Sequence, residues 1–426
     1  MKSFSFLIVL LVWCALSIFF LNAGRIAFAG SGSTYYIASN GSDRSSCSVK
    51  SPCATIQYVM RNVARPGDTI MLRGGSYNEN EIWIRGDSGY SDGGAPEKLK
   101  TIKAYPGEVV NMVNGSRPFI IEADYIRIEG LNLSNGKAIG IRGLNRSTIQ
   151  IVGNTFKGSG YSWAAVDTHG NNILIEGNVC DIEGNSVGTQ GHCYYISHGD
   201  KIVIRNNIAK GMAGYGIHVF DQRRSEDSQN FERIIKNMLI EGNMVSDSKQ
   251  RAGIIIAAYD HARIENAVIR NNIAFNNASG GIVIRSESKN IHVYNNTVVN
   301  NGGFALSINY GGVKNASVEG LYIKNNILVI NAKGDATHVK NSTNDTNITL
   351  QNNLYWPGSP RLHNISDSSP HVGDPLFVNS DVANFYLKQG SPAINKGLLL
   401  TDVSVDKDGI SRPQGSGYDI GAYEYK

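Results

Sequence analysis

The feature that most constrains this chain is a repeat of alternating apolar and polar residues, which closes with Gly-Asn or Asn-Asn in all copies but the first. The repeat occurs nine times, at spacings of 23 to 36 residues. Its copies begin at Ile126, Ile149, Ile173, Ile202, Met238, Ala267, Ile291, Leu321 and Ile348. A period of two predicts β-strands rather than amphipathic helices. Irregular spacing of this kind is normal for stacked β-coils that accept loop insertions.

A second apolar stretch follows each repeat copy, as in residues 165–169 and 216–220. Two or three strands per coil, wound in parallel, predict an all-β fold, a right-handed parallel β-helix with Ile, Val and Leu stacked inside. The last Asn of the motif recurs from Asn154 to Asn353. We assign these asparagines to a structural ladder at one corner, because Asn tolerates the left-handed conformation and stacked amides hydrogen-bond along the axis.

The N-terminal segment predicts export. Residues 4–21 form an apolar run behind Lys2, and the small-residue site Ala27-Phe28-Ala29 follows, which is the pattern of a secretory signal peptide. An uncleaved anchor is the alternative, because about 18 apolar residues just span a bilayer. We expect a secreted protein, periplasmic or extracellular, that does not contact the membrane after cleavage.

Four cysteines remain beyond this leader, and they allow three pairings. Cys47 and Cys53 enclose only five residues in a turn-rich loop, so we expect them to form a disulfide, with Cys180 to Cys193 as the second bridge. The formal net charge of +4 gives no large basic field, so we expect no nucleic-acid partner. We expect a monomer.

Both ends of a solenoid need covers, because open strand edges pair with other chains. Residues 54–64 carry apolar side chains at helical spacing and predict a short N-terminal capping helix. After residue 356 the repeat ceases, and the tail predicts a β-rich C-terminal cap over the last coil. We therefore divide the chain into four parts, namely a signal peptide at 1–29, an N-terminal cap and first coils at 30–118, the β-helix repeats at 119–356, and a C-terminal capping segment at 357–426.

Outward side chains of neighbouring coils lie about 4.8 Å apart and form ladders. Each second apolar stretch begins with a small residue, such as Ala165 or Gly216. The residues two positions after these small residues are Arg142, Asp167, Tyr195, His218, Ile255, Val283, Ser307 and His338. Asp167, Tyr195 and His218 are adjacent and ionisable, which predicts one site. The same strands carry flanking polar residues at His192, His169, His198 and Asp221. We assign Arg285, Asp260, His261 and His338 to structure, because they lie coils away.

A long insertion, DQRRSEDSQNFERIIKN, begins at Asp221 and is the most charged part of the chain. It directly follows His218, so it is expected to form a lid or a cleft wall that carries Arg223 and Arg224. A solvated charge run is the alternative interpretation.

Cleavage of a polyuronate by β-elimination needs a neutraliser for the carboxylate, a base and an acid. Arg223, Arg224 or a bound Ca²⁺ are candidates for the neutraliser. His218 or His192 are candidates for the base, and Tyr195 for the proton donor or the base itself. Asp167 would orient a histidine, while His169, His198 and Asp221 would contact substrate. These residues require no cofactor for the reaction. Ca²⁺ is the one cofactor that we expect this chemistry to use, if any.

The opening YYIASNGSD…CATIQYV…PGDTIMLRGGSY and the ending GSPAINKG…DKDGISRPQGSGYDIGAYEY resemble terminal blocks of the secreted bacterial right-handed β-helix proteins of the pectate-lyase-like superfamily. The resemblance covers residues 35–78 and 119–426. Members of that group include lyases, uronate epimerases, hydrolases and proteins with no established reaction. The run GHCYYIS resembles the His-Gly-apolar-Tyr strand of many relatives, which implies roles for His192 and Tyr195.

The leading hypothesis is an exported polysaccharide lyase that acts on an acidic, uronate-containing glycan. A noncatalytic carbohydrate-binding or cell-surface protein is the first alternative. A glycoside hydrolase is the second, and it would need Asp167 and Asp221 as its two carboxylates. A uronate epimerase is the third, although the chain lacks the Asp-Pro-His-Glu run of the epimerases it resembles in fold, and it also lacks the clustered aspartates of polygalacturonases.

Overall fold

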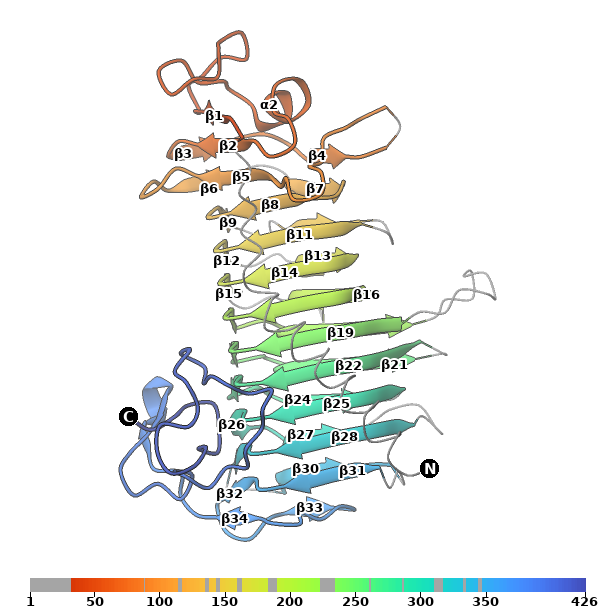
Figure 1. Cartoon of the computed structure of the whole chain (residues 1–426), viewed down its shortest axis with the longest axis vertical. Coiled ribbons are helices and arrows are strands. Elements are labelled where there is room, and N and C mark those ends of the chain that lie inside the picture. Colours follow the sequence, from red (N-terminus) through yellow and green to blue (C-terminus); the bar gives the residue numbers. More distant parts are fainter. Residues whose placement is uncertain are drawn as a thin grey trace, which may run out of the picture.

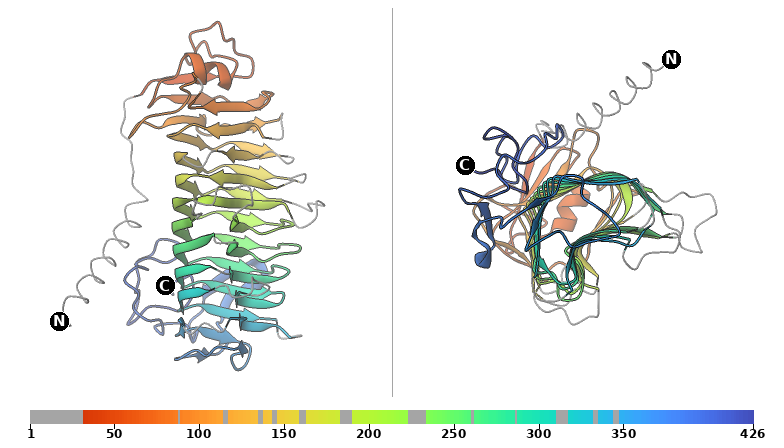
Figure 2. Two further views of the ribbon diagram at one scale, coloured as in Figure 1. Left: turned by 90° about the vertical axis from the view of Figure 1, so that its right-hand side faces the viewer. Right: turned by 90° about the horizontal axis from the view of Figure 1, so that it is seen from below.

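The computed structural model describes residues 32–426 except 88, 114–116, 135–137, 143–145, 159–162, 183–189, 223–233, 260–261, 286, 310–316, 332–334 and 344–346. The predicted signal peptide lies outside these residues. The described part is an elongated stack of coils (Figure 1), and the coils superpose when the stack is viewed along its axis (Figure 2). Strands of successive coils pair in parallel, so the fold is a parallel β-helix with three faces.

Face 1 carries the strands of the sequence repeat. Its strands are β1 (Thr34–Ile37), β2 (Thr69–Leu72), β5 (Lys100–Ala104), β8 (Ile126–Glu129), β11 (Ser147–Val152), β14 (Asn171–Glu176), β16 (His192–Arg205), β19 (Ile234–Glu241), β22 (Arg263–Arg270), β25 (Ser288–Tyr294), β28 (Val318–Lys324) and β31 (Ile348–Gln351).

Face 2 follows the asparagine corner and has short strands. They are β3 (Gly75–Tyr77), β6 (Val110–Met112), β9 (Asn132–Ser134), β12 (Thr155–Lys157), β15 (Val179–Asp181), β17 (Ile208–Lys210), β20 (Met244–Ser246), β23 (Ile273–Phe275), β26 (Thr297–Asn301), β29 (Ile327–Ile330), β32 (Leu354–Trp356) and β34 (His371–Val372).

Face 3 carries the second strands that the sequence predicts. They are β4 (Ile82–Arg85), β7 (Phe119–Glu122), β10 (Ile139–Ile141), β13 (Ala164–His169), the first half of β16, β18 (Ile217–Gln222), β21 (Ile254–Tyr259), β24 (Gly280–Arg285), β27 (Phe304–Ile308), β30 (Thr337–Asn341) and β33 (Leu362–His363). The long strand β16 joins faces 1 and 3 into one sheet.

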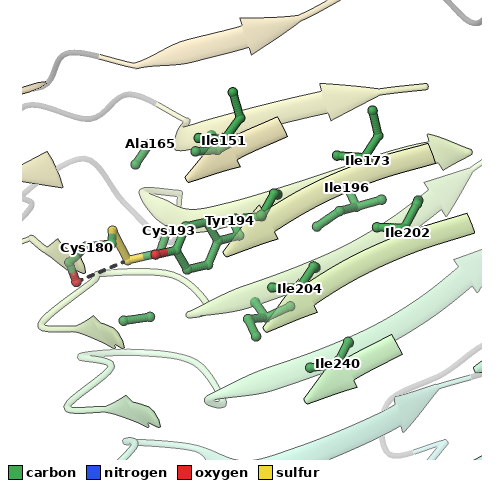
Figure 3. Close-up of a cluster of buried hydrophobic side chains, with 14 of the residues drawn as sticks. Ile151, Ala165, Ile173, Cys180, Cys193, Tyr194, Ile196, Ile202, Ile204 and Ile240 are labelled. Carbon is green, nitrogen blue, oxygen red and sulfur yellow. Dashed lines mark hydrogen bonds between the residues drawn. A yellow bond between two sulfur atoms is a disulfide. The ribbon is translucent and has the colours of Figure 1, made fainter. Parts of the chain in front are cut away.

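The interior is a continuous column of apolar side chains, because alternate residues of every strand turn inward. Ile149, Ile173 and Ile202 occupy equivalent places on successive coils and are buried. Figure 3 shows such isoleucines stacked beside the disulfide of Cys180 and Cys193. The burial of this apolar column is the main favourable contribution to folding.

The corner between faces 1 and 2 explains the motif. From Asn178 to Asn353 the last Asn of each copy is buried, and its Oδ1 accepts from the backbone N–H of the ladder asparagine one coil earlier, at 2.9 to 3.0 Å. Asn154 begins the ladder, and its Oδ1 accepts from the Leu131 N–H. The predicted structural ladder is confirmed. The expectation that these same residues are left-handed is wrong. The preceding residue takes that conformation, for example Gly153 at φ 62° and Asn271 at φ 55°.

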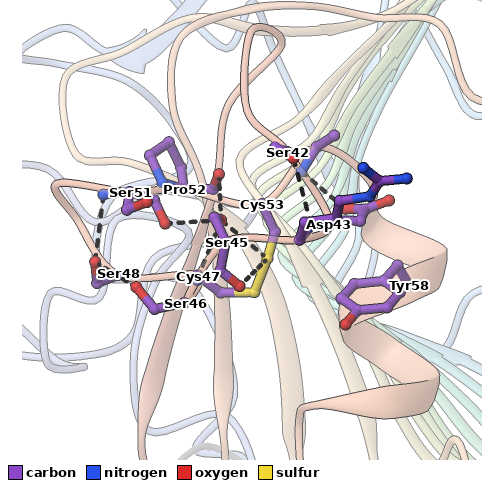
Figure 4. Close-up of a disulfide and its surroundings, with 12 residues drawn as sticks. Ser42, Asp43, Ser45, Ser46, Cys47, Ser48, Ser51, Pro52, Cys53 and Tyr58 are labelled. Atoms are coloured by element: carbon purple, nitrogen blue, oxygen red, sulfur yellow. Dashed lines mark hydrogen bonds between the residues drawn. A yellow bond between two sulfur atoms is a disulfide. The ribbon is translucent and has the colours of Figure 1, made fainter.

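The first coils are capped by helix α2 (Ile56–Asn62), which confirms the short helix that the sequence predicts. Thr55 caps its N-terminus, where the Thr55 side chain accepts from the Tyr58 backbone N–H. The disulfide of Cys47 and Cys53 closes the loop before the helix (Figure 4). The structure thus contains both bridges expected from the cysteine spacing.

The capping segment expected at 357–426 divides in two. Its first part covers the last coil, because β33 and β34 pair in parallel with β30 and β32, whereas the tail that we expected there lies beside the stack (Figure 1). This C-terminal segment is residues 374–426. It contains β35 (Phe377–Asn379), the 3₁₀ helix η1 (Ser380–Val382) and β36 (Asn384–Leu387). Its apolar side chains pack against the outer side of face 2. The left-handed corner residues Asn271, Asn295 and Asn325 donate to its backbone carbonyls at 2.9 to 3.0 Å. The polar corner, rather than the open end, therefore holds this segment.

Within the described residues, no helix has the length and apolar character needed to cross a membrane.

Candidate functional site

The three adjacent ionisable residues of the predicted ladder lie on one face and in register. On face 3, Asp167 pairs with Tyr195, and Tyr195 pairs with His218. The register is confirmed from Asp167 to Ser307. It is wrong at both ends, where Gly140 and Lys340 take the places expected for Arg142 and His338.

His338 is buried, and its ring bonds to two backbone groups. Its Nδ1 accepts from the Arg361 N–H, and its Nε2 lies 3.0 Å from the Trp356 carbonyl oxygen. Its assignment to structure is thus supported.

A pocket of about 410 Å³ opens over the middle of face 3. Its described lining consists of Trp163, Gln190, His192, Tyr195, Tyr215, His218, Phe220, Arg251, Ile255, Ala257 and Arg285. The pocket brings together three of the four predicted catalytic residues, and it leaves out Asp167.

The predicted residues form a tight group of rings. The Tyr195 ring lies 5.0 Å from that of His218 and 5.2 Å from that of Trp163, measured between centroids and with T-shaped geometry. Tyr215 lies 4.6 Å from His218 and completes the wall. Tyr195 is 7% exposed and Trp163 is 36% exposed. Trp163 therefore stands at the mouth of the pocket, and the phenol lies at its floor.

Hydrogen bonding fixes the tautomers of the two histidines. The Tyr215 backbone N–H donates to His192 Nδ1 at 2.9 Å, so a neutral His192 carries its proton on Nε2. That Nε2 lies 3.1 Å from His218 Nδ1 and donates to it. His218 must then carry its own proton on Nε2. The Nδ1 lone pair of each ring already accepts a hydrogen bond, and the Nε2 of each ring carries a proton. Neither neutral ring therefore has a free lone pair, which argues against its predicted role as the base.

Both histidines are held neutral. Burial lowers the pKa of His192 to about 3, and the positive charge of Arg251 adds to this effect. Burial also lowers the pKa of His218, with further contributions from His192 and Arg251. Two neutral imidazoles and two guanidiniums therefore face the same pocket at neutral pH.

Asp167 interacts away from the pocket. Its carboxylate lies 3.8 Å from Arg117 Nη2 and 3.9 Å from His169 Nε2. Burial raises its pKa, and the charges of His169, Arg117 and Arg142 oppose the shift. Asp167 is a neighbour of Tyr195 in the sheet, but the described contacts do not place it against either pocket histidine.

The predicted substrate-binding residues fall at the far ends of the same strands. His169 contacts the Ser197 hydroxyl, while His198 Nδ1 lies 3.5 Å from Asp221 Oδ2. Asp221 is buried. None of these three lines the pocket, and Arg223 and Arg224 lie outside the described residues.

The sequence did not indicate two of the aromatic rings and both guanidiniums of the lining, namely Trp163, Tyr215, Arg251 and Arg285. Arg285 was assigned to structure, yet the register places it on the ladder of Phe220 and Ala257. The counting rule that found His218 would have found Arg285 two residues further on. Trp163, Tyr215 and Arg251 precede their strands, so strand periodicity gave no signal for them.

The described lining does not suit Ca²⁺. This ion prefers several oxygen ligands, carboxylates above all, whereas the pocket presents two guanidiniums and no described carboxylate. Elsewhere in the described part of the chain, no group of three or more His, Cys, Asp or Glu residues could hold a metal ion. The positive charge at this pocket comes from Arg251 and Arg285.

The fold and the pocket define a parallel β-helix protein with a ring-lined site on one face. The family model for the Pel9A-like right-handed β-helix region matches residues 35–348, so the chain belongs to that family and its coils are right-handed, as predicted. No curated protein matches the chain.

Three solved structures are similar to this chain, and the first of them shows the fold. Pectate lyase Pel9A has a TM-score of 0.56 and 16% identity, covering 95% of this chain and 99% of Pel9A. XylC in complex with xylose has a TM-score of 0.49 and 11% identity, covering 92% and 99%. The A-module of the mannuronan C-5 epimerase AlgE6 from Azotobacter vinelandii has a TM-score of 0.41 and 16% identity, covering 72% and 90%.

Proposed function

We propose that this protein is an exported polysaccharide lyase that cleaves an acidic, uronate-containing glycan by β-elimination. The observation that carries the proposal is the single pocket that joins the Tyr195 phenol, the His192–His218 pair and the guanidiniums of Arg251 and Arg285. A pectate lyase among the solved structures of similar fold supports this class of reaction. The two disulfides support a location outside the cytoplasm.

The first requirement of the reaction is a neutralised carboxylate. A guanidinium binds a carboxylate through two parallel hydrogen bonds and withdraws charge from it. This makes the neighbouring C5–H of a uronate more acidic. Arg251 and Arg285 take this role; the predicted Arg223 and Arg224 lie outside the described residues. Trp163, at the mouth, offers a flat ring on which an adjacent sugar can stack.

The second requirement is a base and an acid. The Tyr195 phenol first releases its proton to solvent, and the resulting phenolate takes the proton from C5. The C–H electron pair forms the C4=C5 double bond, and the C4–O4 bond breaks. The same phenol then returns its proton to the departing O4, which regenerates the phenolate. His218 presents its Nε2–H as a hydrogen-bond donor, and His192 is a positioning residue because it fixes that tautomer.

The test is an assay for the unsaturated product, followed by ultraviolet absorbance, with pectate, alginate and glycosaminoglycans as substrates. Replacing Tyr195 by Phe removes one hydroxyl and keeps the ring. We expect Tyr195→Phe to lower kcat by about 10²- to 10⁴-fold and to leave the thermal transition within a few degrees. The matched control is Tyr322→Phe, because Tyr322 lies on face 1 in register with His292.

The other outcomes would assign a different function. Retention of the protein by a glycan without cleavage indicates a binding protein. New reducing ends without unsaturation indicate a hydrolase, although the described pocket lining holds no carboxylate pair for that reaction. Exchange of the C5 proton with solvent without chain cleavage indicates an epimerase.

A further inference from the structure

A second pocket, of about 650 Å³, lies between face 2 and the C-terminal segment. Its described lining consists of Asn276, Val299, Asn300, Val329, Ile330, Asn331, Trp356, Pro357, Asp374, Pro375, Phe377 and Ser380. Face 2 provides Val299, Val329 and Trp356, which are register partners on successive coils. The opposite wall comes from the start of the C-terminal segment. This pocket is separate from the one on face 3, and the two share no described lining residue.

The lining combines flat apolar rings with exposed amides. Trp356 and Phe377 are half-buried and belong to the apolar cluster between face 2 and the C-terminal segment. Asn276 and Asn300 follow Phe275 and Val299, which are register partners, so their amides lie about one coil spacing apart. Both asparagines are exposed, and neither side chain bonds to another described residue. Two amides therefore face solvent beside two aromatic rings.

The charge of this pocket is opposite to that of the first. Its described lining holds the Asp374 carboxylate and no Lys, Arg or His. One Asp374 oxygen accepts from the Leu376 backbone N–H at 2.9 Å, which fixes the carboxylate. A fixed anion without a lining cation repels a ligand that carries its own carboxylate. The ligand that fits has hydroxyls for the amides and the carboxylate, an apolar face for the rings, and no negative charge.

We infer that this second pocket is a binding site for a neutral sugar of a polysaccharide chain. Trp356 and Phe377 stack on the sugar's C–H face, the amides of Asn276 and Asn300 exchange hydrogen bonds with its hydroxyls, and Asp374 accepts from them and excludes uronates. A pocket of this volume accommodates an oligosaccharide end. The inference does not depend on the lyase proposal. The protein then holds a neutral glycan on face 2 and an acidic glycan on face 3.

The test is calorimetric titration of the purified protein with uncharged oligosaccharides derived from xylan, glucan, mannan and galactan, with an oligogalacturonate as the charged comparator. We expect at least one neutral series to bind with a Kd in the millimolar range or tighter. Trp356→Ala should weaken that binding by about tenfold, and Asn300→Ala by a few fold. Asp374→Asn should let the oligogalacturonate bind at this pocket.

Trp163→Ala is the matched control, because it removes the tryptophan of the face 3 pocket. It should leave neutral-sugar binding unchanged, while Trp356→Ala should leave cleavage of acidic glycans unchanged. The inference is overturned if no neutral oligosaccharide binds, or if binding survives Trp356→Ala and Asn300→Ala together. It is also overturned if Trp356→Ala abolishes binding of the uronate instead. If Trp356→Ala fails to fold, the exposed variants Asn300→Ala and Asp374→Asn decide the matter.

Discussion

The asparagine corner and the ring cluster on face 3 both place side chains at equivalent positions of successive coils, but they differ in how often the residue repeats. The corner carries the same amide from Asn154 to Asn353, and each is buried and bonded to the next. Face 3 changes at every step, from Gly140 through Asp167 and Tyr195 to His218. The scaffold needs a uniform ladder, since one missing amide leaves its neighbours unpaired.

Whether a residue type repeats from coil to coil therefore distinguishes structural from functional residues, and this distinction needs only the one sequence. A position that repeats in every coil serves the stack, because every coil poses the same packing problem. A cluster that occurs once, such as Tyr195 with His192 and His218, solves no problem that the other coils share. Stability at the corner, titration of the histidines and activity on face 3 each test this separation.

The largest expected effect is on stability, at the middle of the corner ladder. Asn243→Ala removes the acceptor of the Asn207 N–H and Nδ2, and the donor to the Ile204 carbonyl. These groups stay buried without partners, so we expect the free energy of unfolding to fall by about 3 kcal/mol or more. The measurement is a urea denaturation curve.

Asn300→Ala is the control for this loss, because it removes an exposed amide of the same type. It should lower the free energy of unfolding by only about 1 kcal/mol, because the left-handed backbone of Asn300 (φ 51°) disfavours Ala but no buried group loses a partner. If Asn243→Ala and Asn300→Ala unfold at the same urea concentration, the corner amides do not stabilise the stack, and the separation of roles fails.

The next effect is on pH dependence. His192 has a pKa of about 3 in the folded state against about 6.5 when unfolded. Between these two pKa values the unfolded chain binds a proton at this imidazole that the folded protein does not bind. The free energy of unfolding therefore rises with pH in this range, and this stabilisation is lost progressively as the pH falls below 6.5. We expect a loss of about 1.4 kcal/mol per pH unit from this group, and His218 adds to it in the same direction.

Denaturation at pH 7 and pH 5 measures this slope. His192→Asn should flatten the slope, whereas Asn243→Ala should keep it, because amides do not titrate. Equal slopes for the parent and His192→Asn would show that the buried imidazole does not carry the effect.

The smallest expected effect is on catalysis, through His192 as a positioning residue. In His192→Asn the side-chain oxygen can still accept from the Tyr215 N–H, but the donor to His218 Nδ1 is lost. We expect kcat to fall about tenfold. The pKa of His218 should rise, because one of the causes that lowers it is removed. The acid limb of the pH–rate profile should therefore move to higher pH, whereas a lower kcat with an unmoved acid limb would contradict the role.

The repeat predicted the strands of face 1, the corner ladder and the register of Asp167, Tyr195 and His218, because all of these depend on period-two alternation and coil spacing. It assigned the left-handed conformation to the wrong residue, since a pattern of Gly-Asn and Asn-Asn does not say which member bends the chain. The residue before each ladder asparagine can be Gly, as at Gly153, or Asn, as at Asn271, because both residue types tolerate a positive φ. Only the second member must be an amide.

The composition of the site was harder to predict, because side chains enter the pocket from loops as well as strands. Trp163, Tyr215 and Arg251 come from segments with no period. Asp167 was in register, yet it lies with Arg117 and His169, and sequence spacing does not reveal such a competing partner. The histidine tautomers depend on one backbone N–H, that of Tyr215, which no sequence pattern encodes.

The docking of the C-terminal segment on the corner asparagines has a consequence for how such a chain can change in length. Asn271, Asn295, Asn325 and Asn352 reach the backbone carbonyls of Val405, Asp419, Leu398 and Lys396, so this part of the tail acts as a ruler laid against four successive coils. Gain or loss of one coil there would displace an anchor by about 4.8 Å and break the match. The corners at Gly153, Gly177 and Gly242 carry no anchoring side chain. A lineage of such proteins can therefore grow or shrink by whole coils only on the N-terminal side of the ruler.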